Sequence, residues 1–137
     1  MSAHLEVSAE LELRLLVPGA SLPVQAGIRY HRSDPYAVTV EFRTGEEPVV
    51  WTFARQLLTD GVARMVGDGD VKVWPSRDGG ERLVCISLSS PSGQALFEAP
   101  LGDVVSFLTR TYELVPTGTE GDHLDLDSEL ALLLWDS

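Results

Sequence analysis

The sequence of 137 residues contains a single cysteine, Cys85, so no disulfide can form within the chain. Chains without disulfides are typical of a reducing compartment. Cys85 lies inside an apolar run rich in β-branched residues, where a thiol usually packs as a small inert side chain. We therefore expect a cytoplasmic protein, and we assign no catalytic role to Cys85.

Positive charge is scarce. Ten Lys and Arg stand against 21 Asp and Glu, which gives a formal net charge of −11, and Lys72 is the one lysine. The arginines are scattered singly, whereas a phosphate-binding surface needs clustered basic side chains. This balance disfavours direct contact with nucleic acid or with an anionic membrane. From Glu113 onward the chain has acids and no base, a pattern typical of a solvated tail, with docking to a basic partner as the alternative.

Long apolar runs are absent. No stretch approaches the roughly 20 apolar residues that a membrane span needs, and residues 1–12 have neither the basic region nor the apolar run of a signal peptide. We expect no direct membrane insertion. Because 44 % of the residues are apolar and 23 % are charged, we expect one globular domain over residues 1–137.

Motifs that carry chemistry are missing. The sequence has no G-x-S-x-G elbow, no G-x-G-x-x-G loop and no Walker lysine. His123 lies among Asp122, Asp125 and Asp127, which could hold a divalent cation, but acids at a helix start are also favoured by the helix dipole. Residues 67–70, Gly-Asp-Gly-Asp, suit a plain turn better than a calcium loop. We predict no catalytic residue, no cofactor and no bound metal, and hence no enzyme.

Alternation of apolar and polar residues predicts strands in the first part of the chain. Every second residue from Val7 to Val17 is apolar, which is the period of a strand with one buried face. A short helix around residues 53–58 follows, with Thr52 as its cap and Gly61 at its end. The strands expected before this helix cover residues 7–17, 24–30, 36–42 and 49–51.

The same order of elements repeats in the second part. A helix from Leu101 to Tyr112 follows the strands, because Leu101, Val104, Val105, Leu108 and Tyr112 form a one-sided stripe. The strands expected before this helix cover residues 62–66, 71–74, 83–88 and 94–99, with turns at 67–70 and 90–93. A last short helix begins at about residue 127 and runs through residue 134. Four strands and a helix, twice, indicate an α+β fold with antiparallel sheets.

The tryptophans separate into two groups. Trp51 and Trp74 lie in apolar β runs and are expected to pack in the core, although with Phe53 they could instead stack single-stranded bases. Trp135 lies off the stripe of the last helix, close to the chain end, where an exposed indole would indicate an interface. We therefore name Asp127, Glu129 and Trp135 as the candidate partner-binding residues.

Several strings, taken together in order and spacing, resemble the SsgA-like proteins of actinobacteria from about residue 11 to residue 130. They are Leu22-Pro23-Val24 with Gly27 to Tyr30, Asp34 to Val38, Phe42 to Gly45, Trp51 to Arg55, Gly69 to Pro75, Ile86 to Pro91 with Gly93, Ala95 to Pro100, Phe107 to Tyr112 and Val115 to Glu120.

This resemblance implies a function that composition and spacing do not reach. It implies a non-enzymatic role in sporulation-specific cell division, in which the protein localises FtsZ, the tubulin-like division protein, to future septa with SsgA-type helpers. It also implies a whirly-like fold of two curved antiparallel sheets with helices, assembled as a homotrimer. Because the whirly fold also serves single-strand nucleic-acid binders, such binding is the alternative function, although the charge of −11 opposes it.

Overall fold

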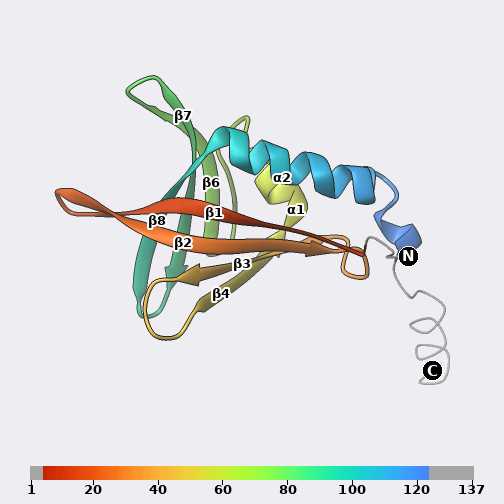
Figure 1. Cartoon of the computed structure of the whole chain (residues 1–137), viewed down its shortest axis with the longest axis horizontal. Helices are drawn as coiled ribbons and strands as arrows, with labels where there is room; N and C mark the ends of the chain where they lie inside the picture. The colour runs from red at the N-terminus through yellow and green to blue at the C-terminus, as the bar shows by residue number, and fades with distance from the viewer. Residues whose placement is uncertain (1–4, 124–137) are drawn as a thin grey trace.

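The computed structural model describes residues 5–123 (Figure 1). Eight strands and two α-helices follow in the order predicted, four strands and a helix and then again four strands and a helix. The bounds are β1 Glu6–Val17, β2 Ala20–His31, β3 Ala37–Arg43, β4 Val49–Ala54, α1 Arg55–Gly61, β5 Val66–Asp68, β6 Val71–Asp78, β7 Glu81–Ser90, β8 Gly93–Pro100, α2 Leu101–Leu114 and a 3-10 turn η1 Glu120–His123. The predicted helix from residue 127 lies outside the described residues.

The hairpin of β1 and β2 shows how the sequence pattern fixes local structure. The two strands pair antiparallel along their whole length, from Glu6 opposite His31 to Val17 opposite Ala20. Gly19 takes a positive φ of 76° in the turn, a conformation that glycine adopts without the steric cost of a side chain. Val7, Leu11 and Leu13 on β1 are buried, so the predicted apolar face is the core face.

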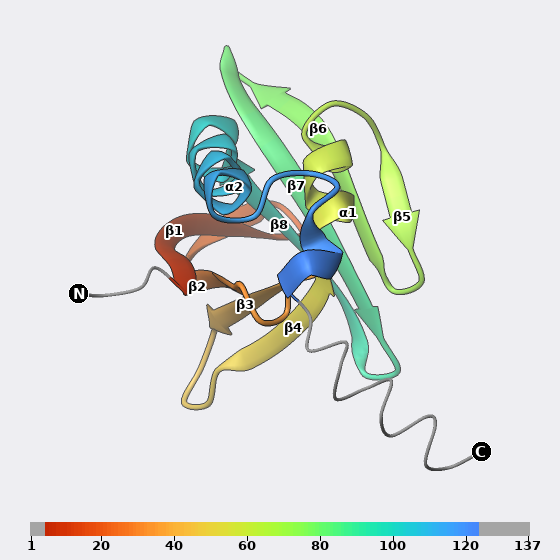
Figure 2. The ribbon, with the colours of Figure 1, turned by 90° about the vertical axis from the view of Figure 1, so that its right-hand side faces the viewer.

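The expectation of two sheets is not confirmed, because hydrogen bonding joins all eight strands into one sheet in the order β4-β3-β2-β1-β8-β7-β6-β5. Each half is a four-stranded antiparallel meander, and the halves meet where Arg14 and Leu15 of β1 pair with Glu98 and Phe97 of β8. Figure 2 shows the halves lying at an angle, with both helices on the inner side. Side-chain alternation predicts which face of a strand is buried, but it does not predict which strand pairs with which. The pairing of β1 with β8 could therefore not be predicted from the sequence.

The core fills the angle between the two halves. α1 packs against β4, β5 and β6, whereas α2 packs against β1, β7 and β8. On α2 the buried face includes Phe107 and Thr111 and leaves Val105 41 % exposed, so it is rotated from the predicted stripe. Phe42 of β3 and Phe97 of β8 stack with ring centroids 4.3 Å apart, which joins the two meanders through their side chains.

Several boundaries differ from those predicted. Thr52 belongs to β4, and α1 begins at Arg55 after Ala54, without a side-chain cap. The strand expected over 62–66 is a turn until Val66, and β6 continues past Pro75 to Asp78. Tyr36, expected on an apolar strand face, is 54 % exposed in the turn before β3. The strand predicted over 62–66 is wrong except at Val66, and Phe53, expected on the helix, belongs to β4. The ends of elements are set by packing and strand pairing, which side-chain periodicity does not mark.

Candidate functional site

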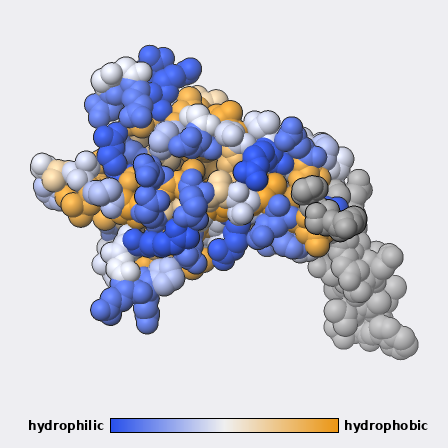
Figure 3. Space-filling model, in the orientation of Figure 1, coloured by the Kyte–Doolittle hydropathy of each residue, from blue (hydrophilic) through white to orange (hydrophobic). Residues whose placement is uncertain are grey.

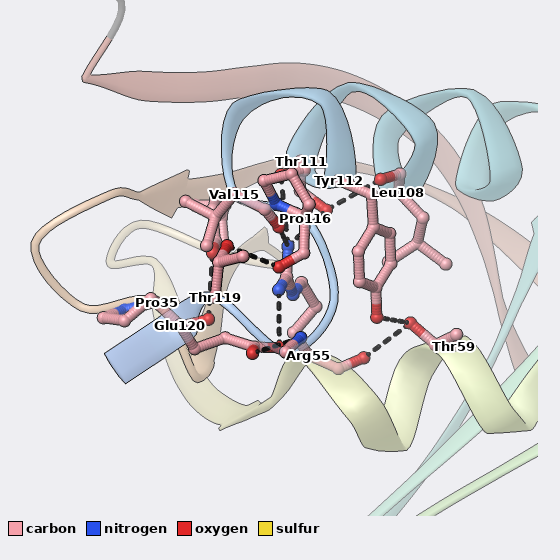
Figure 4. A network of polar contacts seen from close by, with 12 residues as sticks. Pro35, Arg55, Thr59, Leu108, Thr111, Tyr112, Val115, Pro116, Thr119 and Glu120 are labelled. Atoms are coloured by element: carbon pink, nitrogen blue, oxygen red, sulfur yellow. Dashed lines mark hydrogen bonds and ion pairs between the residues drawn. The ribbon is translucent and has the colours of Figure 1, made fainter. Parts of the chain in front are cut away.

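Arg55 is the most completely buried charged residue that the structure describes, at 1 % exposure. It is the first residue of α1, and its backbone N–H donates to the carbonyl of Tyr36 at 2.8 Å. Its guanidinium Nη1 donates to the carbonyls of Thr111 at 3.1 Å and Val115 at 2.9 Å, at the end of α2 (Figure 4). The Thr111 carbonyl also accepts from the backbone N–H of Val115 at 2.8 Å, so Arg55 adds a second donor there and supplies one to the carbonyl of Val115, and it thereby caps α2 from another element.

Two tyrosine rings enclose the guanidinium of Arg55. Its Cζ lies 3.9 Å from the ring centroid of Tyr112 and 4.8 Å from that of Tyr30, distances at which a cation and an aromatic face attract. The Tyr30 hydroxyl donates to the carbonyl of Pro35 at 2.9 Å, and burial raises the pKa of Tyr30 to about 12. Tyr112 shares a 2.6 Å hydrogen bond with Thr59 on α1. Both rings are therefore fixed by hydrogen bonds as well as by packing.

Glu120 completes what we call the Arg55 network, which consists of Tyr30, Arg55, Thr111, Tyr112, Val115 and Glu120. Its Oε2 accepts from Arg55 Nη2 at 2.9 Å, and its Oε1 accepts from the backbone N–H of Gly118 at 2.8 Å. A hydrogen bond from its own backbone N–H, followed by those from Arg55 and Gly118, lowers the pKa of the Glu120 carboxyl below its usual value of 4.5. The network thus fixes the chain just before its last residues.

Replacement Glu120→Gln is expected to remove part of the acid sensitivity of the fold. A carboxyl whose pKa is lowered in the folded state stabilises that state fully above its unfolded pKa, and the contribution disappears as pH falls through the folded pKa. The difference in free energy of unfolding between the natural protein and this variant should therefore shrink as pH falls below about 4.5. Urea unfolding at steps between about pH 6 and about pH 3.5 measures it; a gap that stays constant over this range would contradict the assignment.

The Arg55 network holds segments of the chain together and offers no group for a reaction. Within residues 5–123, every buried side-chain nitrogen and oxygen has a hydrogen-bond partner, so the network leaves no free group aimed at a substrate. What it does is join the turn before β3, the start of α1, the end of α2 and η1 (Figure 4). Sequence reasoning missed Arg55. The available signal was a lone arginine between Phe53 and Leu57, two residues of a predicted apolar face.

The structure separates the aromatic residues that could have stacked nucleic-acid bases. Phe53 is buried in the core, and Trp51 is half-buried against that core on the edge strand β4. Trp74 lies on β6, beyond β3, β2, β1, β8 and β7 in the sheet, and it faces away from the buried Val73. The three rings form no shared platform, so core packing is the better interpretation for Phe53 and Trp51.

The remaining predicted residues carry no reactive arrangement in the part of the chain that the structure describes. Cys85 is buried as expected, and desolvation raises the pKa of its thiol. No group of three or more His, Cys, Asp or Glu among residues 5–123 is placed to hold a metal ion. His31 is exposed, and its Nδ1 accepts from the backbone N–H of Ser33 at 3.0 Å. Asp127, Glu129 and Trp135 lie outside the described residues.

Several depressions mark the described surface, and hydrophilic and apolar residues interleave over the face of β1 and β2 (Figure 3). The acidic cleft, of about 500 Å³, has Arg14 in ion pairs with Glu81 at 3.5 Å and Glu98 at 3.6 Å. The helix groove, of about 420 Å³, lies between α1 and α2 and includes Val105 and Glu113. The Phe groove, of about 300 Å³, lies over Phe42 and Phe97. The acidic cleft is lined by Glu10, Glu12, Glu81, Glu98 and Asp103 around Arg14.

Comparison with known proteins points to a single family. Residues 24–120 match the family model described as SsgA, Streptomyces sporulation and cell division protein. The chain is 61 % identical over 134 residues to the sporulation-specific cell division protein SsgB of Frankia casuarinae, covering 96 % of this chain and 94 % of that one. It is 57 % identical over 133 residues to SsgB of Streptomyces coelicolor, covering 96 % and 97 %.

Solved structures agree with the sequence comparison. The crystal structure of the SsgA-like sporulation-specific cell division protein of Thermobifida fusca superimposes with a TM-score of 0.85 at 49 % identity, covering 96 % of this chain and 98 % of that one. A second solved structure, which concerns SsgB mutations and longitudinal cell division during sporulation of Streptomyces coelicolor, gives a TM-score of 0.83 at 55 % identity, covering 89 % and 99 %. Among residues 5–123, no helix is long and apolar enough to cross a membrane.

Proposed function

The chain belongs to the SsgA family of sporulation and cell division proteins, and on that premise we propose that it acts without catalysis in sporulation-specific cell division, where it positions FtsZ at septation sites. The observation that carries the proposal is the 61 % identity to an SsgB over 96 % of the chain. A surface formed by a rigid sheet, with an arginine network that holds chain segments rather than a substrate, supports a binding role.

The proposed partners are FtsZ, SsgA-type division proteins and further copies of the chain itself. We propose that the protein works as a homotrimer of whirly-like architecture in the cytoplasm and is recruited to septa through these partners. Three copies of one weak site bind together far more tightly than one copy, provided that the geometry lets them engage at once. The proposed contact lies in the acidic segment of Asp127, Glu129 and Trp135.

The proposed function is tested by sedimentation of the purified full-length protein with FtsZ polymers. We expect co-sedimentation, and we expect the double variant Asp127→Asn, Glu129→Gln to bind about 3- to 10-fold more weakly, because rim charges mainly set association rates. The matched control is Glu46→Gln, Glu47→Gln, which removes two exposed charges in the turn between β3 and β4.

The outcomes separate the two parts of this proposal. Failure of the full-length protein to bind FtsZ, together with tight binding of single-stranded oligonucleotides at low salt, would replace FtsZ positioning by the nucleic-acid alternative; failure to bind either would also reject FtsZ as the partner. Binding that is equally strong in both double variants would reject only the acidic segment as the contact. A mass of one chain, 14.9 kDa, in sedimentation equilibrium would reject the trimer.

A further inference from the structure

The Phe groove is an apolar depression at the end of the inner sheet face, beside the turns that join β3 to β4 and β7 to β8. Its apolar lining comes from Leu15, Phe42, Val49, Trp51, Leu88 and Phe97. The rest of its lining is small or uncharged, and no acidic or basic side chain contributes. In a protein of net charge −11, a groove without charge favours an apolar occupant.

One wall of the Phe groove belongs to a free sheet edge. β4 is the last strand of the sheet, so one side of its backbone has no neighbouring strand among the described residues. Val49 and Val50 on this strand are 46 % and 50 % exposed. An exposed apolar edge strand invites pairing with other chains, and proteins usually cover it with another segment. At the opposite edge β5 has only three residues, Val66–Asp68, and offers much less to cover.

The end of the chain has the composition that this groove requires. Residues 124–137 contain six leucines and Trp135, with four acids and no base. A tryptophan and six leucines left in water would forgo a large gain in free energy, because burial of each is worth about 1.5–3 kcal/mol. The acidic cleft would repel these four acids, and the helix groove carries Glu113. Of these three depressions, only the Phe groove has no acidic side chain in its lining. A further depression of about 270 Å³ at the start of α2 also lacks acids, but Arg77 and Arg82 line it and it offers no aromatic ring on which an indole could stack.

The reach of the segment matches the position of the groove. Glu120 is bound to Arg55 at the end of β4, and Val49 begins β4, so the groove lies about 20 Å away along that strand. Three extended residues, 124–126, span about 10 Å, and the helix predicted over 127–134 spans about 12 Å. Trp135 therefore comes within reach of the groove if the segment runs back along β4.

We propose that residues 124–137 lie along the free edge strand β4 of the same chain and place the indole of Trp135 in the Phe groove. The Arg55 network fixes the start of this path through Glu120. Docking within one chain is favoured over docking on a separate copy in solution, because the tether gives an effective concentration in the millimolar range. Asp127 and Glu129 remain in water for a partner, since a carboxylate would lose its hydration in an uncharged groove. In this arrangement, which rests on the proposed function, Trp135 serves the partner contact by holding the segment in place rather than by touching the partner.

Cross-linking between cysteines tests this docking without FtsZ, so that its failure is distinct from failure of the proposed function. In a Cys85→Ala background, Ser137→Cys is combined with Ser92→Cys on the rim of the Phe groove and treated with a short bismaleimide at low protein concentration. The matched control combines Ser137→Cys with Thr109→Cys, an exposed position of the helix groove. Gln94→Cys replaces Ser92→Cys if that variant folds poorly.

We expect the cross-link within one chain to form about tenfold faster with the cysteine at Ser92 than with the cysteine at Thr109. Adding Trp135→Ala should slow the cross-link at Ser92 about tenfold. A tenfold change corresponds to about 1.4 kcal/mol, which is less than the free energy gained when an indole is buried. Denaturing gels and intact mass give the product. Equal rates at the two positions, no effect of Trp135→Ala, or a product of twice the chain mass would each overturn the proposal, the last in favour of a second copy.

Discussion

Replacement of Arg55 by alanine is expected to lower the free energy of unfolding by about 3–5 kcal/mol, because a buried guanidinium loses a partly buried ion pair, its contacts with two carbonyls and the space that it fills. The loss has three sources. The Glu120 carboxylate loses its ion-pair partner, the carbonyls of Thr111 and Val115 lose a donor, and a space opens between the rings of Tyr30 and Tyr112. Urea unfolding at neutral pH, followed by tryptophan fluorescence, measures the change.

The matched control for Arg55 is Arg43→Ala. Arg43 also pairs with acids, Glu10 and Glu41, but these ion pairs lie on the open face of the sheet. Exposed ion pairs contribute little to stability because solvent screens them, so this variant should remain close to the natural protein in its free energy of unfolding. Equal losses for the two variants would show that burial does not set the cost. Arg55→Lys is expected to fall between them, because one ammonium cannot reach all three acceptors in the planar arrangement of a guanidinium.

If Arg55→Ala does not fold, the pair Arg55→Met, Glu120→Gln separates the sources of the loss. It removes both charges, so no buried charge is left without a partner. The remaining deficit then reports the loss of Arg55 as a donor to the helix-end carbonyls, about 1 kcal/mol for Val115 and less for Thr111, whose carbonyl keeps the backbone N–H of Val115. Full recovery of stability in this double variant would contradict the capping role of Arg55.

Replacement Gly61→Ala is expected to destabilise the protein by about 1–3 kcal/mol, although alanine is the better helix former by about 1 kcal/mol. Gly61 ends α1 at a point where the helix backbone lies directly on β6. A Cβ at this position would collide with Cβ and Cγ1 of Val73, which is itself completely buried. Val73 has no free space to move into, so the clash must separate α1 from the sheet.

Gly102→Ala supplies the opposite expectation for the same substitution. Gly102 is an exposed residue in the first turn of α2, with no atom within 4 Å of the position that a Cβ would take. Here the gain in helix propensity acts alone and should stabilise the protein by a few tenths to about 1 kcal/mol. The two variants, compared by thermal and urea unfolding, should move in opposite directions. Stabilisation by Gly61→Ala would show that α1 and β6 are not packed this closely.

The sequence located the strands but not the residues on which the fold most depends. Val7, Leu11 and Leu13 were predicted on one strand face, and they are buried there, because alternation of side chains is a local property of extended backbone. Tyr36 obeyed the same period and is nevertheless exposed, because it lies in the turn before β3. Periodicity does not mark the point at which pairing stops, so Pro75 also lies within β6, where a stop was expected.

The candidate partner-binding residues remain a prediction from sequence. Asp127, Glu129 and Trp135 were chosen for charge and for an indole off the helix stripe, and the described residues end before them. The described residues supply three features on which the proposed docking rests: a free edge at β4, an uncharged groove over Phe42 and Phe97, and a fixed point at Glu120. With these three features, a prediction that rested on residue types alone becomes a proposal that names the strand and the groove on which the segment docks.

By itself, the sequence determined the order of elements, the core face of most strands and, through its motifs, the family, because each of these depends on neighbouring residues. Only the tertiary structure decided that β1 pairs with β8, that Arg55 caps the end of α2 and that Gly61 must stay without a side chain. Each of these contacts joins positions far apart in the chain. Burial and pairing between such positions follow from how the whole sheet curls, and no local pattern records that curl.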